Sequence, residues 1–381
     1  MGKFIKYYPL LLLLFISNSY LQGKENEILK IKGYVYNSIT LEPLIAVNVF
    51  IANSYYGATT DKNGFFILEN IPYSTFTLVF QHVGYSVKNE LVNCNREKYI
   101  KISLQPKSIQ MEGIAVYPDR NLLQRVIDKY KRQIILTVFL EKFLGKTENA
   151  KLCEVINPET LHFNYDKNCE KYSVSADTLL IVKNYSLGYT VSVAIKNFKW
   201  VNSLYFNNCY LEYYYFLKYQ EMFSSDSVQL EKWRNDRRKT YLGSCKLLFY
   251  TLSNDSLNNK YFKVYKAKME TKEIIMNMDR YDRGQSVKRV QSLKKVDNCN
   301  IYDILSVTNY VGDCNSLKVP YNIDYVFIEC ENLKESFLEL KNKEIFFDGY
   351  GNFLDGNQVI AGGEWAKCGV ADFLPKEYLP K

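Results

Sequence analysis

The segment "DKNG" that begins at Asp61 is the first place where residue types could do chemistry, because acidic and amide side chains alternate there as in calcium loops. An EF-hand loop beginning at Asp61 would need Asp or Asn at its fifth position, Gly at its sixth and Glu at its twelfth. Those positions hold two phenylalanines and a proline. We therefore expect no metal here and interpret Asp61, Asn63 and Gly64 as a tight structural hairpin turn.

The chain has only two histidines, His82 and His162. A zinc carboxypeptidase needs His-x-x-Glu, but the third residue after each of these histidines is a tyrosine, so metallopeptidase chemistry is excluded. The motifs G-x-S-x-G, G-x-x-x-x-G-K-[ST] and G-x-G-x-x-G do not occur either. We expect His82 to close an apolar row in the core or at its rim. The sequence predicts no catalytic residue, no metal and no cofactor.

Trp233, Arg237 and Tyr241 recur at a spacing that places them on one face of a predicted helix. Arg237 could stack on Trp233 or pair with a carboxylate, while the aromatic faces bind a sugar or an anion, so these three are candidate ligand-binding residues. The alternative is that Trp233 and Tyr241 pack into a core and the stem of Arg237 passes over them. The same two interpretations apply to Trp365.

Charge is unevenly distributed along the chain, which has a formal net charge of +8. Residues 231–295 hold 17 Lys and Arg against 7 Asp and Glu. One interpretation is a patch for an anionic partner such as a membrane surface, and the other is a solvated face. Nucleic acid is not expected as a partner, because the first 23 residues predict export, as described below.

Nine cysteines are present, an odd number that cannot all pair within one molecule. No C-x-x-C motif occurs, so neither a thioredoxin-like dithiol nor a paired zinc knuckle is indicated. We expect mostly buried thiols with one or two disulfides, whose connectivity the sequence leaves open.

Residues 29–116 show the two-residue alternation of consecutive strands. Apolar residues at 31 and 35 alternate with Lys32, Tyr34 and Tyr36. In the same way, Ile100 and Ile102 alternate with the residues at 99, 101 and 103. Short runs of this kind, separated by Gly, Pro and Asn, predict an antiparallel β-sandwich.

The stretch "GYVYNSITLEPLIAVNVFIANSYYGATTDKNGFFILENIPYSTFTLVFQHVGY" resembles the carboxypeptidase-regulatory-like domain, a transthyretin-like (prealbumin-like) sandwich. The ordered positions include Gly33, Gly57, Asp61 and Gly64, followed by Gly84-Tyr85. The resemblance covers about residues 29–105. It implies a fold and a module common on exported and outer-membrane proteins, and it does not imply peptidase activity.

Residues 118–381 form the second predicted domain, a larger α+β domain that begins near Pro118. Helices are expected near 119–144 and 225–252, the first with an apolar stripe that includes Tyr130 and Ile134. Gly243-Ser244 should bend or end the second helix. The blocks "NPETLHFNYD", "WRNDRRKTYLGS" and "GGEWAKCGVADFLPKEYLP" resemble an uncharacterised family of bacterial envelope proteins that follow such sandwiches, for which no activity is implied.

Residues 1–23 predict a secretory signal peptide. Lys3 and Lys6 precede a short apolar run at 9–16, which small and polar residues follow. We therefore expect an exported protein that is periplasmic or associated with the outer membrane.

Together these features predict a non-enzymatic binding or interaction protein of the cell envelope, with an envelope protein or glycan as its unidentified partner. The alternative is a glycan-acting hydrolase that uses paired carboxylates, because such a pair forms only in three dimensions and the sequence does not reveal it. A weaker third hypothesis is a membrane-surface protein that uses the basic stretch 231–295.

Overall fold

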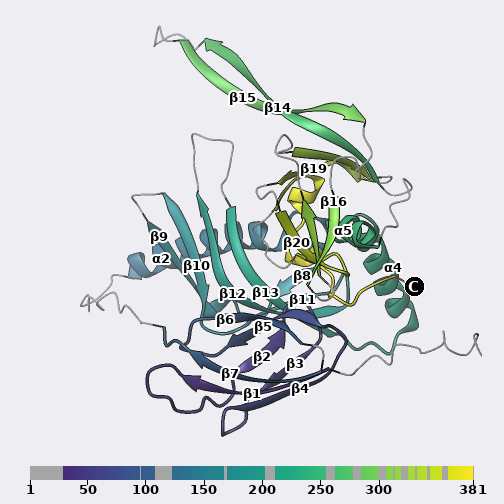
Figure 1. The fold of residues 1–381 in the computed structure, drawn as a ribbon. Helices are drawn as coiled ribbons and strands as arrows, with labels where there is room; N and C mark the ends of the chain where they lie inside the picture. The colour runs from purple at the N-terminus through teal and green to yellow at the C-terminus, as the bar shows by residue number, and fades with distance from the viewer. Residues whose placement is uncertain are drawn as a thin grey trace, which may run out of the picture.

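The structure is a computed structural model that describes residues 29–94, 96–107, 122–166, 170–201, 211–254, 262–277, 285–298, 306–311, 314–318, 325–330, 333–340, 344–353 and 359–380. The predicted signal peptide at 1–23 and the predicted domain boundary near Pro118 lie outside these residues. The sandwich forms one end of the molecule, and a long hairpin extends from the opposite end (Figure 1).

The predicted β-sandwich is confirmed and consists of two sheets. The first, called the outer sheet below, has the strand order β4-β1-β7, with bounds Phe65–Ile71, Leu29–Asn37 and Glu97–Leu104. The second, called the inner sheet, has the order β3-β2-β5-β6, with bounds Gly57–Thr59, Asn48–Ile51, Thr75–Gln81 and Lys88–Asn93. Neighbouring strands run antiparallel except for β1 and β7, the first and last strands, which pair in parallel.

The sandwich core lies between the outer and inner sheets. Ile31 and Val35 of β1 are fully buried there against Leu78 and Phe80 of β5. Gly33 faces the same core, where the carbonyl oxygen of Ile100 would lie 2.1 Å from an added Cβ atom, so no larger residue fits. The alternation predicted from the sequence therefore assigns the correct face of β1 to the core.

The turn at Asp61 differs from the predicted hairpin. The Asp61 carboxylate accepts hydrogen bonds from the backbone N–H groups of Asn63 and Phe65 at 2.8 and 2.9 Å, and Gly64 adopts a φ of 72°. However, β3 before the turn pairs with β2 of the inner sheet, whereas β4 after it pairs with β1 of the outer sheet. The turn is tight, as expected. However, it connects the two sheets of the sandwich, because the strands on either side of it pair with different strands and not with each other.

The second domain is built on a curved six-stranded sheet, called the central sheet. Its path is β8-β11-β12-β10-β9, and β13 pairs with β12. The bounds, in chain order, are β8 Cys153–Val155, β9 Leu161–Asp166, β10 Lys171–Ala176, β11 Leu180–Asn184, β12 Tyr189–Val201 and β13 Leu211–Glu221. A short 3-10 helix, η1 (Pro158–Thr160), precedes β9.

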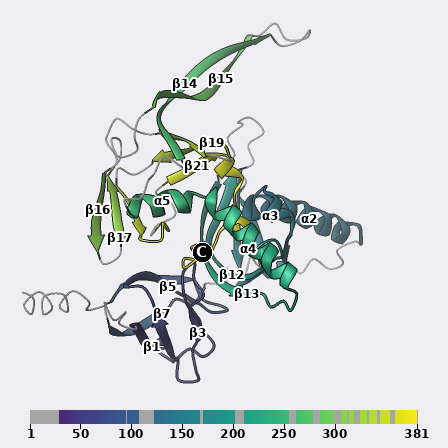
Figure 2. The same ribbon diagram turned by 90° about the vertical axis from the view of Figure 1, so that its right-hand side faces the viewer.

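Helix α2 (Leu122–Leu144) crosses one face of the central sheet (Figures 1 and 2). Its last turns supply Phe139 and Phe143, which are buried and pack edge-on against Phe198 of β12. Tyr130 and Ile134, predicted to lie on the buried stripe, are instead 69% and 49% exposed. Among the described side chains of α2, the buried ones lie toward its carboxyl-terminal end.

The second predicted helix is divided into two, as the Gly243-Ser244 pair indicates. Helix α4 (Ser227–Leu242) is capped by Asp226, whose side chain accepts from the Val228 N–H, and α5 (Cys245–Ser253) is capped by Ser244. Helix α3 (Glu148–Lys151) is a single turn after α2. The buried side chains of α5 join the core of the second domain.

The remaining strands form two further sheets. One has the order β15-β14-β18-β19-β21 and the other β16-β17-β20. Their bounds are β14 Phe262–Asn277, β15 Gln285–Asn298, β16 Ser306–Val311, β17 Cys314–Lys318, β18 Tyr325–Cys330, β19 Leu333–Leu340, β20 Glu344–Asp348 and β21 Val359–Gly363. The β14–β15 hairpin projects from the body (Figures 1 and 2). Two 3-10 helices, η2 (Glu364–Lys367) and η3 (Val370–Asp372), follow β21.

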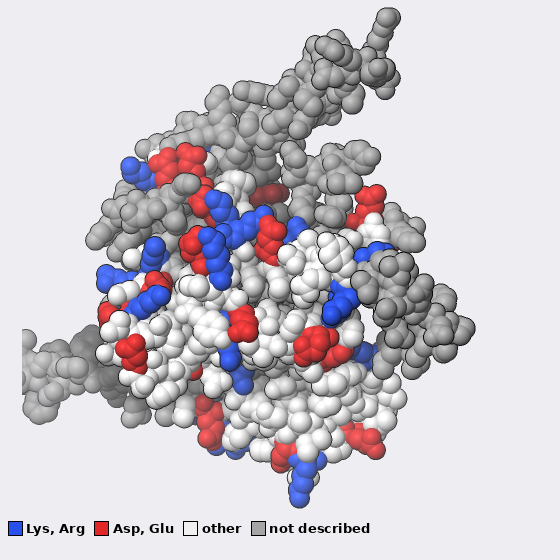
Figure 3. All heavy atoms as spheres, turned by 180° about the vertical axis from the view of Figure 1, so that it is seen from behind, with Lys and Arg blue, Asp and Glu red and all other residues white. Residues whose placement is uncertain are grey.

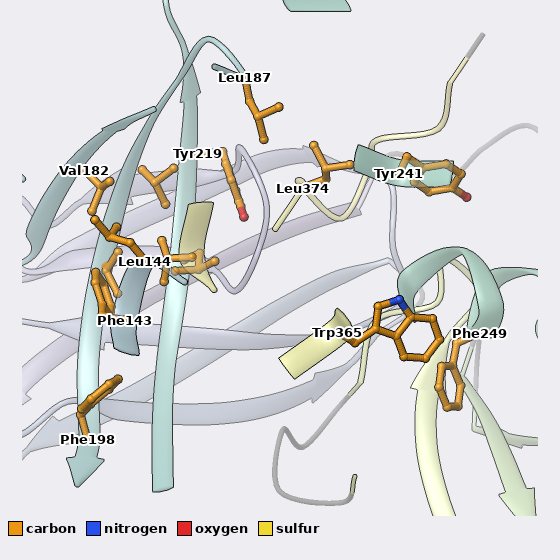
Figure 4. Close-up of a cluster of buried hydrophobic side chains, with 14 of the residues drawn as sticks. Phe143, Leu144, Val182, Leu187, Phe198, Tyr219, Tyr241, Phe249, Trp365 and Leu374 are labelled. Atoms are coloured by element: carbon orange, nitrogen blue, oxygen red, sulfur yellow. The ribbon is translucent and has the colours of Figure 1, made fainter. Parts of the chain in front are cut away.

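One continuous core holds the second domain together. Figure 4 shows Phe143, Phe198, Trp365 and Phe249 as parts of this cluster, together with Leu374 from the end of the chain. The carboxyl-terminal residues therefore fold back into the centre of the domain that they complete.

The inner sheet packs on the central sheet through an apolar cluster. Phe50 and Val79 of the inner sheet are fully buried against Ala194 and Phe216 of the central sheet. Burial of each large apolar side chain contributes about 1.5–3 kcal/mol. Strand β5 is consequently buried on both faces, since one face meets the outer sheet and the other meets the second domain.

Among the described side chains, Cys94, Cys153 and Cys368 are free thiols. Burial raises the pKa of Cys153 to about 12, so its thiol stays protonated at neutral pH, whereas Cys368 is exposed. Cys169, Cys209 and Cys299 lie outside the described residues, and the prediction of one or two disulfides stays a prediction. None of the described helices combines the length and the apolar character needed to cross a bilayer.

Candidate functional site

The solvent face of the outer sheet carries a cluster of aromatic rings, which we call the aromatic platform and define as Tyr34, Tyr36, Phe65 and Tyr99. Tyr34 lies at its centre, with ring centroids 6.2 Å from Tyr36, 5.3 Å from Phe65 and 6.0 Å from Tyr99. Tyr99 is 53% exposed and the other three rings are half-buried. Strand geometry explains the cluster, because alternate residues of β1 face solvent while the others fill the core.

Charged residues line the platform in cross-strand rows. Lys30 pairs with Glu69, and Lys32 pairs with Glu97 at 2.5 Å. Lys32 holds the pKa of the Glu97 carboxyl below its usual range. Lys101 is exposed, lies opposite Tyr34 in the ladder between β1 and β7, and pairs with no carboxylate of the described residues.

The face of α4 that carries Trp233, Arg237 and Tyr241 docks the helix onto the central sheet. Trp233 is 7% exposed, and its indole N–H donates to the Tyr185 carbonyl at 2.9 Å. Its ring lies over Gly188, where an added Cβ atom would be 2.3 Å from the ring carbon Cδ2. Tyr241 is 2% exposed and packs edge-on against Tyr378.

Arg237 lies over a different ring from the one expected. Its guanidinium carbon is 3.9 Å from the centroid of Tyr189, and among the described residues it makes no cation–ring contact with Trp233. Its nitrogens donate to the Leu187 and Gly188 carbonyls at 2.7 and 3.1 Å, and to Glu221 at 2.8 Å. These contacts join α4 to the loop before β12. Ligand binding by Trp233, Arg237 and Tyr241 stays a prediction.

The end of the chain forms a strap, defined as residues 374–378, across the junction between the two domains. The Lys376 N–H donates to the Asn53 carbonyl of the sandwich at 2.5 Å, and its ammonium group donates to the Thr75 carbonyl at 3.2 Å. The same ammonium group pairs with Asp348 at 3.2 Å and lies 4.1 Å from the centroid of Tyr73. Lys376 and Asp348 are 3% and 2% exposed, so a buried ion pair joins the strap to the second domain while the hydrogen bonds of Lys376 join it to the sandwich.

A second lysine lies beneath the strap. The Lys246 ammonium group of α5 donates to the carbonyls of Pro375 and Lys376 at 2.5 and 3.1 Å. The pKa of Lys246 is lowered to about 7, mainly by burial and also by the nearby Lys376 charge, against the opposing effects of Asp348 and Glu377. Loss of solvation therefore outweighs the two carboxylates that face it.

Two tyrosine hydroxyls at this junction, those of Tyr73 and Tyr219, are buried and have no hydrogen-bond partner among the described residues. Burial raises the pKa of both, with Glu377 adding to the effect. Both hydroxyls therefore stay protonated at neutral pH. Buried polar groups of this kind commonly bind internal water.

The two histidines lie apart from the platform and the strap. The half-buried His82 follows the end of β5 and contacts Tyr85 edge-on, at the rim of the sandwich. His162 of β9 is exposed and forms a 2.6 Å contact with Asp177. Trp365 is buried and donates to the Gly243 carbonyl at 2.8 Å. No group of three or more His, Cys, Asp or Glu in the described part of the chain has a metal-binding arrangement.

The basic stretch 231–295 is described in part. In α4, Arg234 pairs with Glu231, and Arg237 pairs with Glu221. The side chains of residues 268–295 lie outside the described residues. On the face that Figure 3 shows, basic and acidic groups are interspersed among neutral surface. An anionic membrane partner for this stretch stays a prediction.

The family model of the CarboxypepD_reg-like domain matches residues 31–116. The sandwich is a CarboxypepD_reg-like domain. The resemblance expected for residues 118–381 stays a prediction. No curated protein compared with this chain matches it significantly.

Solved structures resemble the chain only weakly. A cohesin–X-dockerin complex from Acetivibrio cellulolyticus is 18% identical over 19% of this chain and 52% of that chain, about half of its length, with a TM-score of 0.18. A Bacteroides uniformis protein whose description proposes carbohydrate binding is 6% identical, over 84% of this chain and 98% of its own, with a TM-score of 0.18. A Bacteroides fragilis protein of unknown function, described as a proposed membrane-associated protein, is 10% identical, over 88% and 94%, with a TM-score of 0.18. A TM-score this low supports no conclusion about function.

Sequence reasoning did not identify the aromatic platform or the strap. A signal for the platform was present, because Tyr34, Tyr36 and Tyr99 occupy the outward positions of strands in the CarboxypepD_reg-like domain. The strap gave no such signal. Lys376 and Asp348 are 28 residues apart in the sequence, and only the fold brings them together.

Replacement of Gly188 by Ala should weaken the docking of α4. Gly188 has a φ of 67°, which costs an alanine about 1–2 kcal/mol, and the clash with Trp233 adds about 1–3 kcal/mol. Gly84→Ala is the matched control, since Gly84 has a φ of 80° but nothing within 4 Å of an added Cβ atom. Urea unfolding should show the larger loss of stability for Gly188→Ala. Equal losses in the two variants would mean that the contact with Trp233 is not tight.

Replacement of Lys376 by Met should destabilise the whole chain by about 3 kcal/mol, because it leaves the buried Asp348 carboxylate without its counter-charge. Lys367→Met is the control, since Lys367 pairs with Glu364 near the surface and such pairs contribute about 0–1 kcal/mol. Thermal and urea unfolding measure the stability of both variants. A Lys376→Met protein as stable as Lys367→Met would show that the strap does not depend on its ion pair.

Proposed function

We propose that this chain is an exported, non-enzymatic binding protein of the cell envelope that holds its ligand on the aromatic platform of its CarboxypepD_reg-like domain. One observation carries the proposal. Strand β5 of the inner sheet is covered on both faces, whereas the outer sheet leaves Tyr34, Tyr36, Phe65 and Tyr99 together on its solvent face.

The composition of the platform supports binding. A tyrosine ring offers a large apolar face, and its hydroxyl group tolerates water, so tyrosine serves surfaces that are solvated when free and covered when bound. Contiguous apolar patches on soluble proteins are often functional sites, whereas single exposed apolar residues are common. Tyr34 and the three rings around it form a contiguous patch, which is the kind that is often functional.

The second domain would act as the support. It covers the inner sheet with the hydrophobic contacts of Phe50 and Phe216, and the strap crosses the same junction. With that side of the sandwich occupied, a partner approaching the domain meets the outer sheet or the loops at its ends. An envelope glycan or an envelope protein is the expected partner.

Export rests on the sequence. Lys3, Lys6 and the apolar run at 9–16 have the arrangement of a secretory signal. Location in the periplasm or at the outer membrane forms part of the proposal, as does the non-enzymatic role.

Fractionation of the native cells, followed by sedimentation of purified full-length protein with isolated envelopes, tests the proposal. We expect the protein in the envelope fraction and saturable binding to envelopes. Replacing both Tyr34 and Tyr99 by Ala should weaken that binding by roughly a hundredfold, if each ring contributes about 1–1.5 kcal/mol.

The control is Tyr130→Ala, because Tyr130 is an exposed tyrosine of α2 outside the platform. This variant should bind envelopes as the wild type does. Wild-type binding by a folded Tyr34→Ala/Tyr99→Ala protein, or its absence from the envelope fraction, would contradict the proposal.

A further inference from the structure

The geometry points to an acidic oligosaccharide as the ligand of the aromatic platform. This inference rests on the proposed function and names the chemical class of its ligand. Three observations support it: the shape of the platform, its exposed area and the charge beside its central ring.

The shape suits sugar rings. Tyr34 and Tyr36 are stacked along β1 with an angle of 23° between their planes. Aromatic faces carry negative charge density, and the axial C–H groups of a pyranose are weakly positive, so the two surfaces attract and exclude water. The centroid separation of 6.2 Å is of the order of the length of one pyranose unit. Successive sugars of one chain can therefore lie over successive rings.

The exposed area fits a short oligosaccharide better than a protein. An aromatic side chain offers about 150–250 Å², so one ring that is 53% exposed and three half-buried rings present on the order of 200–300 Å². A stable protein interface takes about 800 Å² from each partner. The contact area that two to four sugar rings need is no larger than the exposed area of the platform.

The positive charge beside the rings favours acidic oligosaccharides over neutral ones. Lys30 and Lys32 are neutralised by the carboxylates of Glu69 and Glu97. Lys101 has no carboxylate partner among the described residues, and its backbone lies opposite that of Tyr34. A sugar stacked on Tyr34 that carries a carboxylate can pair with this ammonium group.

The ion pairs beside the platform also offer acceptors. The Glu97 carboxyl remains ionised, because Lys32 lowers its pKa, and it lies in the row next to Tyr99. An ionised carboxylate accepts hydrogen bonds from sugar hydroxyls, which are donors without charge. The platform therefore combines ring stacking with both a cation and hydroxyl acceptors.

Calorimetric titration of the full-length protein with defined tetrasaccharides tests the inference. The panel contains uronic acid tetrasaccharides (oligogalacturonate, oligomannuronate and hyaluronan fragments) and neutral tetrasaccharides of glucose and mannose. We expect at least one uronic acid tetrasaccharide to bind about fivefold or more tightly than any neutral one, with a preference that weakens as salt is raised.

Two variants separate the contributions of stacking and charge. Tyr34→Ala should lower the affinity for the preferred tetrasaccharide by roughly tenfold. Lys101→Gln should reduce that affinity to the level of the neutral sugars. Lys98→Gln is the matched control, because Lys98 is an exposed lysine of the same strand whose ammonium group donates to the Asn93 carbonyl instead. It should leave all affinities unchanged.

Three outcomes would overturn the inference. The first is no binding of any tetrasaccharide at millimolar concentration, the second is equal affinity for acidic and neutral sugars, and the third is equal loss in Lys98→Gln and Lys101→Gln. If envelope binding still depends on Tyr34 and Tyr99 in the sedimentation assay, the inference fails while the proposed function stands. If envelope binding itself is absent, both fail.

Discussion

The contact between the inner sheet of the sandwich and the central sheet of the second domain determines how the rest of the molecule is organised. A sandwich sheet ordinarily has one face in the core and one in water. Here Phe50 and Val79 give the inner sheet a second apolar face, which Ala194 and Phe216 cover. Backbone pairing strengthens the contact, since the Asn53 N–H donates to the Leu217 carbonyl at 2.7 Å. The second domain thus covers β5 of the inner sheet, while the aromatic side chains of the outer sheet face solvent.

The strap at the end of the chain adds specificity to this contact. Burial of Lys376 and Asp348 has a desolvation cost that their attraction offsets only if every remaining donor and acceptor is satisfied. Lys376 donates to the Thr75 carbonyl, and Asp348 accepts from the N–H groups of Tyr350 and Asn352. Another placement of the sandwich would cost Lys376 its hydrogen bonds to the Thr75 and Asn53 carbonyls, while the ion pair itself lies within the second domain. The apolar contact therefore buries hydrophobic surface between the domains, and the hydrogen bonds from Lys376 to the sandwich backbone favour one arrangement of the two domains.

The fold could be predicted from the sequence where local patterns decide the structure. Alternation in β1 and β7 assigned the faces of the sandwich, and Asp226 and Ser244 cap the two helices that meet near Gly243. Local patterns did not predict which strands pair, because strand pairing depends on the rest of the fold. The turn at Asp61 has the expected geometry, but its flanking strands belong to different sheets.

The candidate site could be predicted only in part. The tyrosines of the platform stood at predicted outward positions, but their contact depends on the order β4-β1-β7, which includes a parallel pairing of the first and last strands. No local pattern encodes that pairing. Trp233, Arg237 and Tyr241 do share a helical face, as their spacing indicated, and tertiary packing directs that face toward the loop before β12.

Coupling between the two domains can be measured directly, because all three tryptophans, Trp200, Trp233 and Trp365, belong to the second domain. Their fluorescence reports the unfolding of that domain, while hydrogen exchange in β1 and β7 reports the unfolding of the sandwich. Phe50→Ala removes a sandwich side chain from the interface and should lower both stabilities together, by about 3–5 kcal/mol. A tryptophan transition that stays at the wild-type midpoint while β1 and β7 lose protection would contradict the account.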